Sequence, residues 1–210
     1  MDKDPIGKVV VPQTEGYWQE RYDKKEDQWE KGAPSPGLVD FLARLAPEQK
    51  AGRVIQPGCG RGHDLAAFAE AGFSGVGIDI APTAVEDARK LHGTFVEGGE
   101  LDFSCENYFE TSAGKWRGQF DWYFEHTFFC AIEPALRDQY VRSVLDVLKP
   151  GGYFLAIFFH IQPDEGPPFG TTQAELETRF LPHFELIEAK VPRSYTNRTG
   201  LELLWWMKRK

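Results

Sequence analysis

The fold of this 210-residue chain is decided by the stretch Arg53-Val54-Ile55-Gln56-Pro57-Gly58-Cys59-Gly60-Arg61-Gly62-His63-Asp64. Its pattern is that of a short strand, a glycine-rich turn and the first turn of a helix. Glycine lets a backbone approach a ligand closely because it carries no Cβ. A second predicted strand, at 75–80, contains Asp79, 21 residues after Gly58. An acid at the tip of this strand can accept hydrogen bonds from ribose hydroxyls, so the two strands predict a site for a nucleotide-type cofactor.

Strands and helices alternate on both sides of this stretch. The predicted strands cover residues 53–56, 75–80, 94–97, 120–124, 153–159, 184–191 and 201–207. The predicted helices cover residues 38–45, 64–71, 84–91, 134–148 and 172–181, and the segment 98–118 is predicted to be irregular. Such alternation is typical of a doubly wound α/β fold, in which helices cover both faces of a mostly parallel sheet. We expect seven strands and a single domain over 1–210.

Composition narrows the range of partners. The formal net charge of −8 and the pI near 5.2 argue against a surface that follows nucleic-acid phosphates. No apolar run reaches the length of a membrane span, and the N-terminus lacks a secretory signal. Cys59, Cys105 and Cys130 are too widely spaced for a CxxC site or a disulfide framework. We therefore expect a cytoplasmic monomer that acts on a small molecule and needs no metal.

Residues 1–37 differ from the rest of the chain. Residues 1–15 are polar and lack a period, which predicts a loose arm, whereas 16–31 carry several aromatic rings among many charges. Trp18 and Tyr22 are four residues apart, so they share one face of a predicted helix. This helix either packs its rings on the core or forms a lid whose rings cover a ligand.

Residues with useful chemistry follow the predicted strands. Gly58, Asp79, Asn107 and the pair Glu125-His126 all lie near strand ends. Because ligands bind at the carboxyl ends of parallel strands, we expect these side chains to converge. The spacing Gly58-x-Gly60-x-Gly62 differs from the G-x-G-x-x-G pattern of dinucleotide-binding proteins.

The ordered set of motifs resembles the class I S-adenosylmethionine-dependent methyltransferases, which have a Rossmann-like fold. Pro57 to Asp64 resembles the loop of the thiopurine methyltransferase superfamily. The string Glu125-His126-Thr127-Phe128-Phe129-Cys130-Ala131-Ile132-Glu133-Pro134 is similar to the hallmark of its halide/thiol (thiocyanate) methyltransferase branch. Gly166-Pro167-Pro168-Phe169 is shared by both branches, and Trp18-x-x-x-Tyr22 with Trp29 resembles the aromatic lid segment. The likeness covers residues 16–207.

This resemblance implies S-adenosylmethionine as the cofactor and assigns roles to matching positions. The implied cofactor-binding residues are Trp18, Tyr22, Trp29, Gly58, Gly60, Asp79, Asn107, Tyr108 and Glu125. The implied substrate-binding residues are His126, Phe128 and Phe169, and His126 and Glu125 are the catalytic candidates. In four places the sequence departs from the family pattern: Tyr22 replaces a Trp, Asn107 an acid, and His126 the usual Tyr or Arg, and the segment 98–118 is longer than expected.

The implied reaction is methyl transfer to a small soft nucleophile: a thiol, hydrogen sulfide, thiocyanate or a halide. A thiol attacks as its thiolate, so a neutral His126 could take the proton. His126 could instead position a sulfur anion, or only bond to Glu125 or to backbone. Glu125 either orients His126 or caps the helix predicted to begin at Pro134.

Other functions stay open on the sequence alone. A thiopurine-type enzyme would act on larger aromatic thiols or selenium compounds, and a non-catalytic module would bind S-adenosylmethionine without transferring its methyl group. A nicotinamide-dependent dehydrogenase would share the fold class. Arg61 either pairs with the cofactor's carboxylate or is a surface residue.

Overall fold

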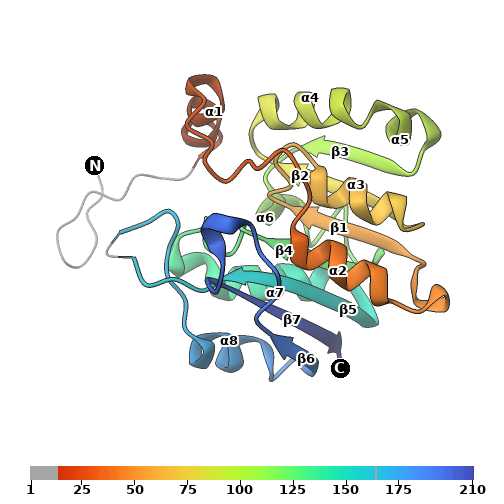
Figure 1. Cartoon of the computed structure of the whole chain (residues 1–210), viewed down its shortest axis with the longest axis vertical. Helices are drawn as coiled ribbons and strands as arrows, with labels where there is room; N and C mark the ends of the chain where they lie inside the picture. The colour runs from red at the N-terminus through yellow and green to blue at the C-terminus, as the bar shows by residue number, and fades with distance from the viewer. Residues whose placement is uncertain (1–13, 164) are drawn as a thin grey trace.

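One seven-stranded sheet organises the computed structural model, which describes residues 14–163 and 165–210 (Figure 1). Its order is β3-β2-β1-β4-β5-β7-β6. Strands β1 to β5 pair in parallel, whereas β7 runs antiparallel to both β5 and β6. The strands are β1 (Arg53–Pro57), β2 (Ser74–Asp79), β3 (Leu101–Cys105), β4 (Phe120–His126), β5 (Leu148–Phe159), β6 (Phe184–Lys190) and β7 (Glu202–Arg209). This arrangement confirms the predicted doubly wound, mostly parallel sheet.

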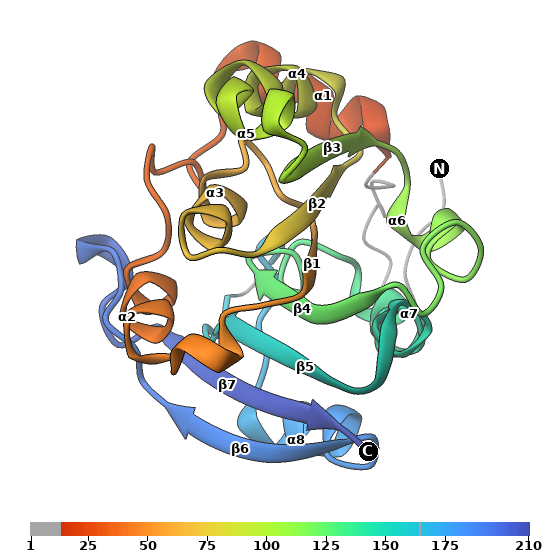
Figure 2. The same ribbon diagram turned by 90° about the vertical axis from the view of Figure 1, so that its right-hand side faces the viewer.

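Helices cover both faces of the sheet (Figure 2). One face carries α2 (Pro36–Arg44), α3 (His63–Glu70), α4 (Pro82–Leu91) and α5 (Gly93–Gly98). The other carries α6 (Tyr108–Thr111), α7 (Arg137–Val147) and α8 (Gln173–Phe180), and α1 (Glu15–Lys24) lies beside α4. Three short 3₁₀ helices complete the described elements: η1 (Pro47–Gln49), η2 (Pro134–Leu136) and η3 (Thr196–Arg198). The part of the predicted N-terminal arm before Thr14 lies outside the described residues.

Alternating strand residues build an apolar core on each face. Ile55 and Tyr123 point to the side of α7 and α8, whereas their neighbours Val54 and Phe124 point to the side of α2 and α3. All four side chains are fully buried. This is expected of central parallel strands, which are covered on both faces.

The third strand lies later in the chain than the sequence predicted. Residues 94–97, predicted as a strand, belong to the helix α5, and β3 occupies part of the segment predicted to be irregular. Leu101 and Phe103 are buried while Asp102 between them is exposed. This alternation is the true strand signal, and it outweighs the β-branched residues of 94–97 because strand preference depends on packing.

The order of the strands creates a cleft next to β1. The chain runs from β1 outward to β3 and then returns to place β4 on the other side of β1. Helices that leave β1 and β4 therefore cover opposite faces, and the carboxyl ends of these strands are left open to a ligand. Among the described residues, no helix has the length and apolar character needed to cross a membrane.

Candidate active site

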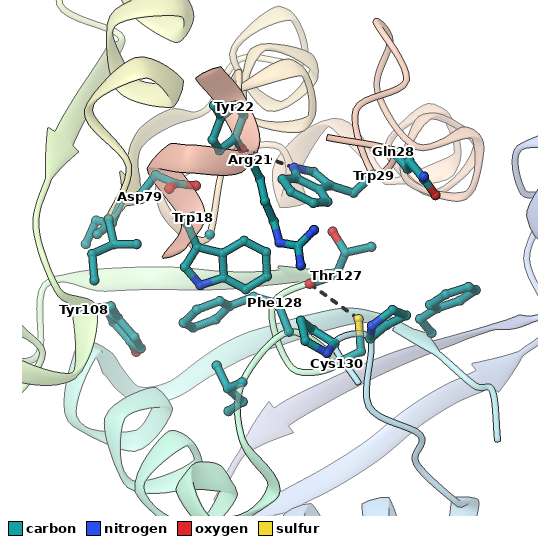
Figure 3. Close-up of a pocket in the computed structure, with 18 of the residues that line it drawn as sticks. Trp18, Arg21, Tyr22, Gln28, Trp29, Asp79, Tyr108, Thr127, Phe128 and Cys130 are labelled. Atoms are coloured by element: carbon teal, nitrogen blue, oxygen red, sulfur yellow. Dashed lines mark hydrogen bonds between the residues drawn. The ribbon is translucent and has the colours of Figure 1, made fainter. Parts of the chain in front are cut away.

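A cavity of about 660 Å³ opens at the carboxyl ends of β1, β2 and β4 (Figure 3). Its roof comes from α1 and the segment that follows, and its floor from the turn after β4. Pro167 and Pro168 from the segment 165–170, and Arg198 from the segment 192–201, line the wall at one end. Of the residues that the sequence assigned to a cofactor or substrate, the cavity is lined by Trp18, Tyr22, Trp29, Gly58, Asp79, Asn107, Tyr108 and Phe128.

The glycine loop owes its shape to its glycines. Gly58, Gly60 and Gly62 all have positive φ, at 63°, 52° and 77°. A Cβ on Gly58 would lie 2.7 Å from the ring of Phe128, and one on Gly62 would lie 2.6 Å from the ring of Phe103. The loop therefore tolerates no larger residue at these two places without a shift of the packed rings.

Asp79 organises the same loop from the tip of β2. Its Oδ2 accepts a hydrogen bond from the Gly60 N–H at 2.9 Å, and its Oδ1 accepts one from the Ala81 N–H at 3.0 Å. Burial raises the pKa of this carboxyl, and the two backbone donors oppose that rise. Gly60 does not line the cavity itself, but it fixes the carboxylate that does.

Three rings of the N-terminal segment pack edge to face above the cavity. The centroid of Trp29 lies 5.4 Å from that of Trp18 and 5.6 Å from that of Tyr22. The Trp29 Nε1–H donates to the hydroxyl of Tyr22 at 3.2 Å, and Tyr22 packs against Ala81 and Ala84. The rings therefore pack on the body of the protein and also line the cavity, and a lid that covers a ligand stays a prediction.

Asn107 and Tyr108 form the wall that follows β3. The Asn107 side chain caps α6 by accepting a hydrogen bond from the Phe109 N–H at 3.1 Å. Its amide group donates to Glu110 at 2.9 Å. Tyr108 is buried beside the ring of Phe128, with 6.1 Å between centroids.

Glu125 is held by protein groups and does not line the cavity. Its carboxylate accepts hydrogen bonds from the Phe128 and Phe129 N–H groups at 2.9 and 2.8 Å, and from the Tyr140 hydroxyl at 2.6 Å. Burial raises the pKa of this carboxyl to about 7. The carboxylate thus caps the turn after β4, which differs from the catalytic role and the cofactor contact that the sequence predicted.

His126 lies behind the cavity wall, between two carboxylates that favour its protonated form. Its Nδ1 lies 2.7 Å from Asp64 Oδ2, and its Nε2 lies 3.5 Å from Glu202 Oε1. Burial lowers the pKa of the imidazole, but the two carboxylates outweigh burial and raise it to about 9. This state differs from the neutral base that the sequence suggested, because a protonated imidazole has no lone pair to accept a proton.

Phe169 also lies apart from the cavity. Its backbone N–H donates to the Cys130 carbonyl at 2.6 Å, and its ring covers Gly166. Its neighbours Pro167 and Pro168 line the wall, whereas Phe169, predicted to contact the substrate, does not.

Two arginines that the sequence did not single out line the cavity. Figure 3 shows the guanidinium of Arg21 extending from α1 between Trp18 and Trp29. Arg198, in η3, is only 6% exposed. In the sequence Arg198 looks like a surface residue, because it is a charged residue in a polar connection. The available signal was the acidic Glu202 four residues later, with which Arg198 forms an ion pair.

Arg61 ties the lid to the glycine loop. Its NH1 lies 2.5 Å from Asp27 and 3.5 Å from Glu30, and its Nε lies 3.0 Å from Asp87 on α4. Its guanidinium also lies 5.3 Å from the centroid of the Tyr22 ring. The partners of Arg61 are therefore protein carboxylates, which differs from the cofactor carboxylate considered from the sequence.

Replacing Arg61 by Gln should loosen this closure. We expect S-adenosylhomocysteine to dissociate about fivefold faster, because the partly buried network contributes roughly 1 kcal/mol. Stopped-flow fluorescence of Trp18 and Trp29 measures this rate. Lys90→Gln is the control, since Lys90 is exposed and its ion pair with Glu86, at 3.9 Å, lies on the surface of α4. An unchanged rate for Arg61→Gln would show that the network does not hold the lid.

The family model described as thiopurine S-methyltransferase matches residues 13–200. The chain belongs to the thiopurine S-methyltransferase family. It is 31% identical over 201 residues to thiocyanate methyltransferase 1 of Brassica oleracea, covering 92% of this chain and 86% of that protein. It is 30% identical over 181 residues to probable thiol methyltransferase 2 of Arabidopsis thaliana, covering 86% and 78%. Thiopurine S-methyltransferase of Bos taurus is 25% identical over 181 residues, covering 78% and 74%.

Solved structures agree on the fold. The Burkholderia thailandensis 1,6-didemethyltoxoflavin-N1-methyltransferase, solved with S-adenosylhomocysteine, matches with a TM-score of 0.71 at 18% identity, covering 97% of this chain and 94% of that one. The PH0226 protein of Pyrococcus horikoshii matches with a TM-score of 0.66 at 18% identity, covering 96% and 97%. The fold is that of the class I methyltransferases, and this family member is an S-adenosylmethionine-dependent methyltransferase.

Proposed function

We propose that this methyltransferase acts on a small, soft, anionic acceptor: a thiolate, bisulfide, thiocyanate or a halide. The observation that carries the proposal is Arg198, a buried cation that lines the cavity beside the ring of Phe159. The names of the relatives support it, because two of them are a thiocyanate and a probable thiol methyltransferase.

The donor side is proposed from the groups that face the cavity near β1 and β2. The Asp79 carboxylate is placed to accept hydrogen bonds from ribose hydroxyls, and Asn107 and Tyr108 are placed beside the adenine. The rings of Trp18 and Trp29 cover the remaining length and keep water out. S-adenosylmethionine supplies an activated methyl group on a sulfonium, which an acceptor's lone pair takes by in-line displacement, leaving S-adenosylhomocysteine.

The acceptor side is proposed from the groups near Arg198. The guanidinium of Arg198 lies 5.0 Å from the centroid of the Phe159 ring, and Pro167, Pro168 and Lys31 also line the cavity. A weakly hydrated anion loses little hydration free energy when it leaves water. A nearby guanidinium is therefore enough to attract it. The same charge lowers the pKa of a thiol held beside it and so favours the thiolate.

This arrangement needs no general base within the cavity. Thiocyanate and halides carry no proton, and bisulfide and a guanidinium-paired thiolate have already lost theirs. The chain then contributes alignment and exclusion of water, which together account for much of the rate of a displacement.

Comparing acceptors tests the proposal. The enzyme should methylate bisulfide, thiocyanate and iodide with S-adenosylmethionine, as measured by formation of S-adenosylhomocysteine. Arg198→Gln should lower kcat/KM for thiocyanate roughly 10- to 100-fold, because it removes a charge-assisted hydrogen bond. Arg193→Gln is the matched control, since Arg193 lies in the same connection but is exposed and pairs with Asp40.

Two results would overturn the proposal. One is methylation of a bulky aromatic thiol with none of the small anions, which points to a thiopurine-type enzyme. The other is an Arg198→Gln enzyme that binds S-adenosylhomocysteine and methylates thiocyanate as well as the wild type does.

A further inference from the structure

Four buried charged residues form a continuous group behind the acceptor end of the cavity. They come from four separate elements: Asp64 from α3, His126 from β4, Arg198 from η3 and Glu202 from β7. Each is at most 8% exposed. His126 lies in the centre, with Nδ1 2.7 Å from Asp64 and Nε2 3.5 Å from Glu202. Asp64 is in turn fixed by the Ser35 N–H, which donates to its Oδ1 at 2.6 Å.

Arg198 is held only loosely by this group. Its NH1 lies 3.3 Å from Glu202 Oε1, the same oxygen that faces His126, and 3.4 Å from His126 Nε2, which cannot accept a hydrogen bond while it carries a proton. Glu202 Oε2 is buried and has no hydrogen-bond partner among the described residues. A guanidinium that fully engages a carboxylate forms two parallel hydrogen bonds at about 2.8 Å. Here that pairing is incomplete, and Arg198 also lines the cavity, with its guanidinium carbon 5.0 Å from the centroid of the Phe159 ring in the same wall.

We propose that His126 is a positioning residue, which as an imidazolium shares Glu202 with Arg198 and so leaves the Arg198 guanidinium available to an anionic acceptor. This inference rests on the proposed function and names His126 as the residue that controls how strongly Arg198 binds the acceptor. With both His126 and Arg198 charged, the two carboxylates are balanced by two cations. Loss of the proton from His126 leaves two carboxylates with one cation, so Glu202 draws Arg198 out of the cavity wall.

The other groups around His126 do not take over this role. The ring of Tyr195 lies nearly parallel to the imidazole, with 6.3 Å between centroids, and its hydroxyl donates to the Ala33 carbonyl at 2.6 Å. Burial raises the pKa of Tyr195 well above its usual range, so it stays neutral. Glu125, next to His126 on β4, is occupied by its own three donors. Asp64, Glu202 and Arg198 therefore set the charge that His126 carries.

The sign of the effect follows from this charge balance. The pKa of His126 is raised to about 9, so the imidazolium is present at neutral pH and is lost above pH 9. Binding of an anion at Arg198 should be strong below that pH and should weaken above it. Thiocyanate is the suitable probe, because it stays an anion throughout and its own ionisation adds no pH dependence.

Calorimetry of thiocyanate binding to the enzyme–S-adenosylhomocysteine complex tests the inference between pH 7 and 10. For the wild type we expect Kd to rise about tenfold with a midpoint near pH 9, which corresponds to one pK unit of coupling. Kd for S-adenosylhomocysteine should stay constant. His126→Gln should bind thiocyanate weakly at every pH, and His160→Gln, which replaces a histidine just beyond β5, should keep the wild-type profile.

The outcomes separate this inference from the proposed function. A flat wild-type profile, or a His126→Gln profile that still changes near pH 9, overturns the role of His126 even when thiocyanate is methylated. If thiocyanate neither binds nor is methylated, the proposed acceptor and the inference fail together. If His126→Gln does not fold, NMR titration of the wild-type imidazole decides, because a midpoint below pH 7 contradicts the imidazolium.

Discussion

Replacing Asp79 by alanine should weaken the binding of S-adenosylhomocysteine more than 100-fold. The carboxylate accepts hydrogen bonds from the Gly60 and Ala81 N–H groups, so its loss leaves two backbone donors of the glycine loop without their acceptor. The same change removes the proposed acceptor for the ribose hydroxyls. Each hydrogen bond to a charged group contributes about 1.5–3 kcal/mol, so losing the ribose contacts and the loop shape together costs at least about 3 kcal/mol of binding.

Calorimetry with S-adenosylhomocysteine measures this effect. Asp79→Asn should lie between the wild type and alanine, since an amide oxygen still accepts one hydrogen bond without carrying charge. Asp102→Ala is the control, because Asp102 is exposed on the neighbouring strand β3. Unchanged binding by Asp79→Ala would show that the ribose lies elsewhere.

Replacing Glu125 by alanine should destabilise the whole fold. The change leaves the Phe128 and Phe129 N–H groups and the Tyr140 hydroxyl buried without an acceptor. Each buried donor without an acceptor lowers the free energy of unfolding by about 1–3 kcal/mol. The total loss of stability is therefore several kcal/mol, which lowers Tm by roughly 10 °C or more. The turn after β4 is already strained, because Thr127 has a φ of 64°, which is unfavourable for a β-branched residue.

Scanning calorimetry and activity together show which role Glu125 has. Glu125→Gln keeps an acceptor of the same size, so it should recover most of the stability and most of the activity. If Glu125→Ala folds as stably as the wild type and yet loses methyl transfer, Glu125 takes part in the reaction directly, as the sequence suggested.

Local patterns made the donor side of the cavity predictable from the sequence. The glycine spacing, Asp79 at the tip of a strand and the rings of the lid segment are each visible within a short window. The structure brings them together at one edge of the sheet, because the carboxyl ends of parallel strands meet there. Short stretches of sequence can also mislead, as the third strand shows. Residues 94–97 have the composition of a strand but belong to α5, and only the burial pattern identifies β3.

The part of the cavity near Arg198 depends on contacts between residues that are far apart in the sequence, so no short stretch of sequence reveals them. The charge on His126 comes from Asp64, which is 62 residues away in the chain, and from Glu202 on a strand near the C-terminus. The burial of Arg198 likewise depends on how the β6–β7 connection folds over the ends of the central strands. A histidine that looks like a base in the sequence is therefore held in the fold between two carboxylates that favour its protonated form.

The two connections beside the proposed acceptor site have an evolutionary consequence. Residues 160–170 and 192–201 join elements at the β5–β7–β6 side of the sheet, whereas the proposed donor contacts come from the β1–β2–β3 side and the lid. Insertions or exchanges in these connections can change acceptor preference while the donor side stays intact, because surface connections tolerate variation better than strands. Grafting both segments from a relative with another acceptor is therefore a promising route to redesign this enzyme.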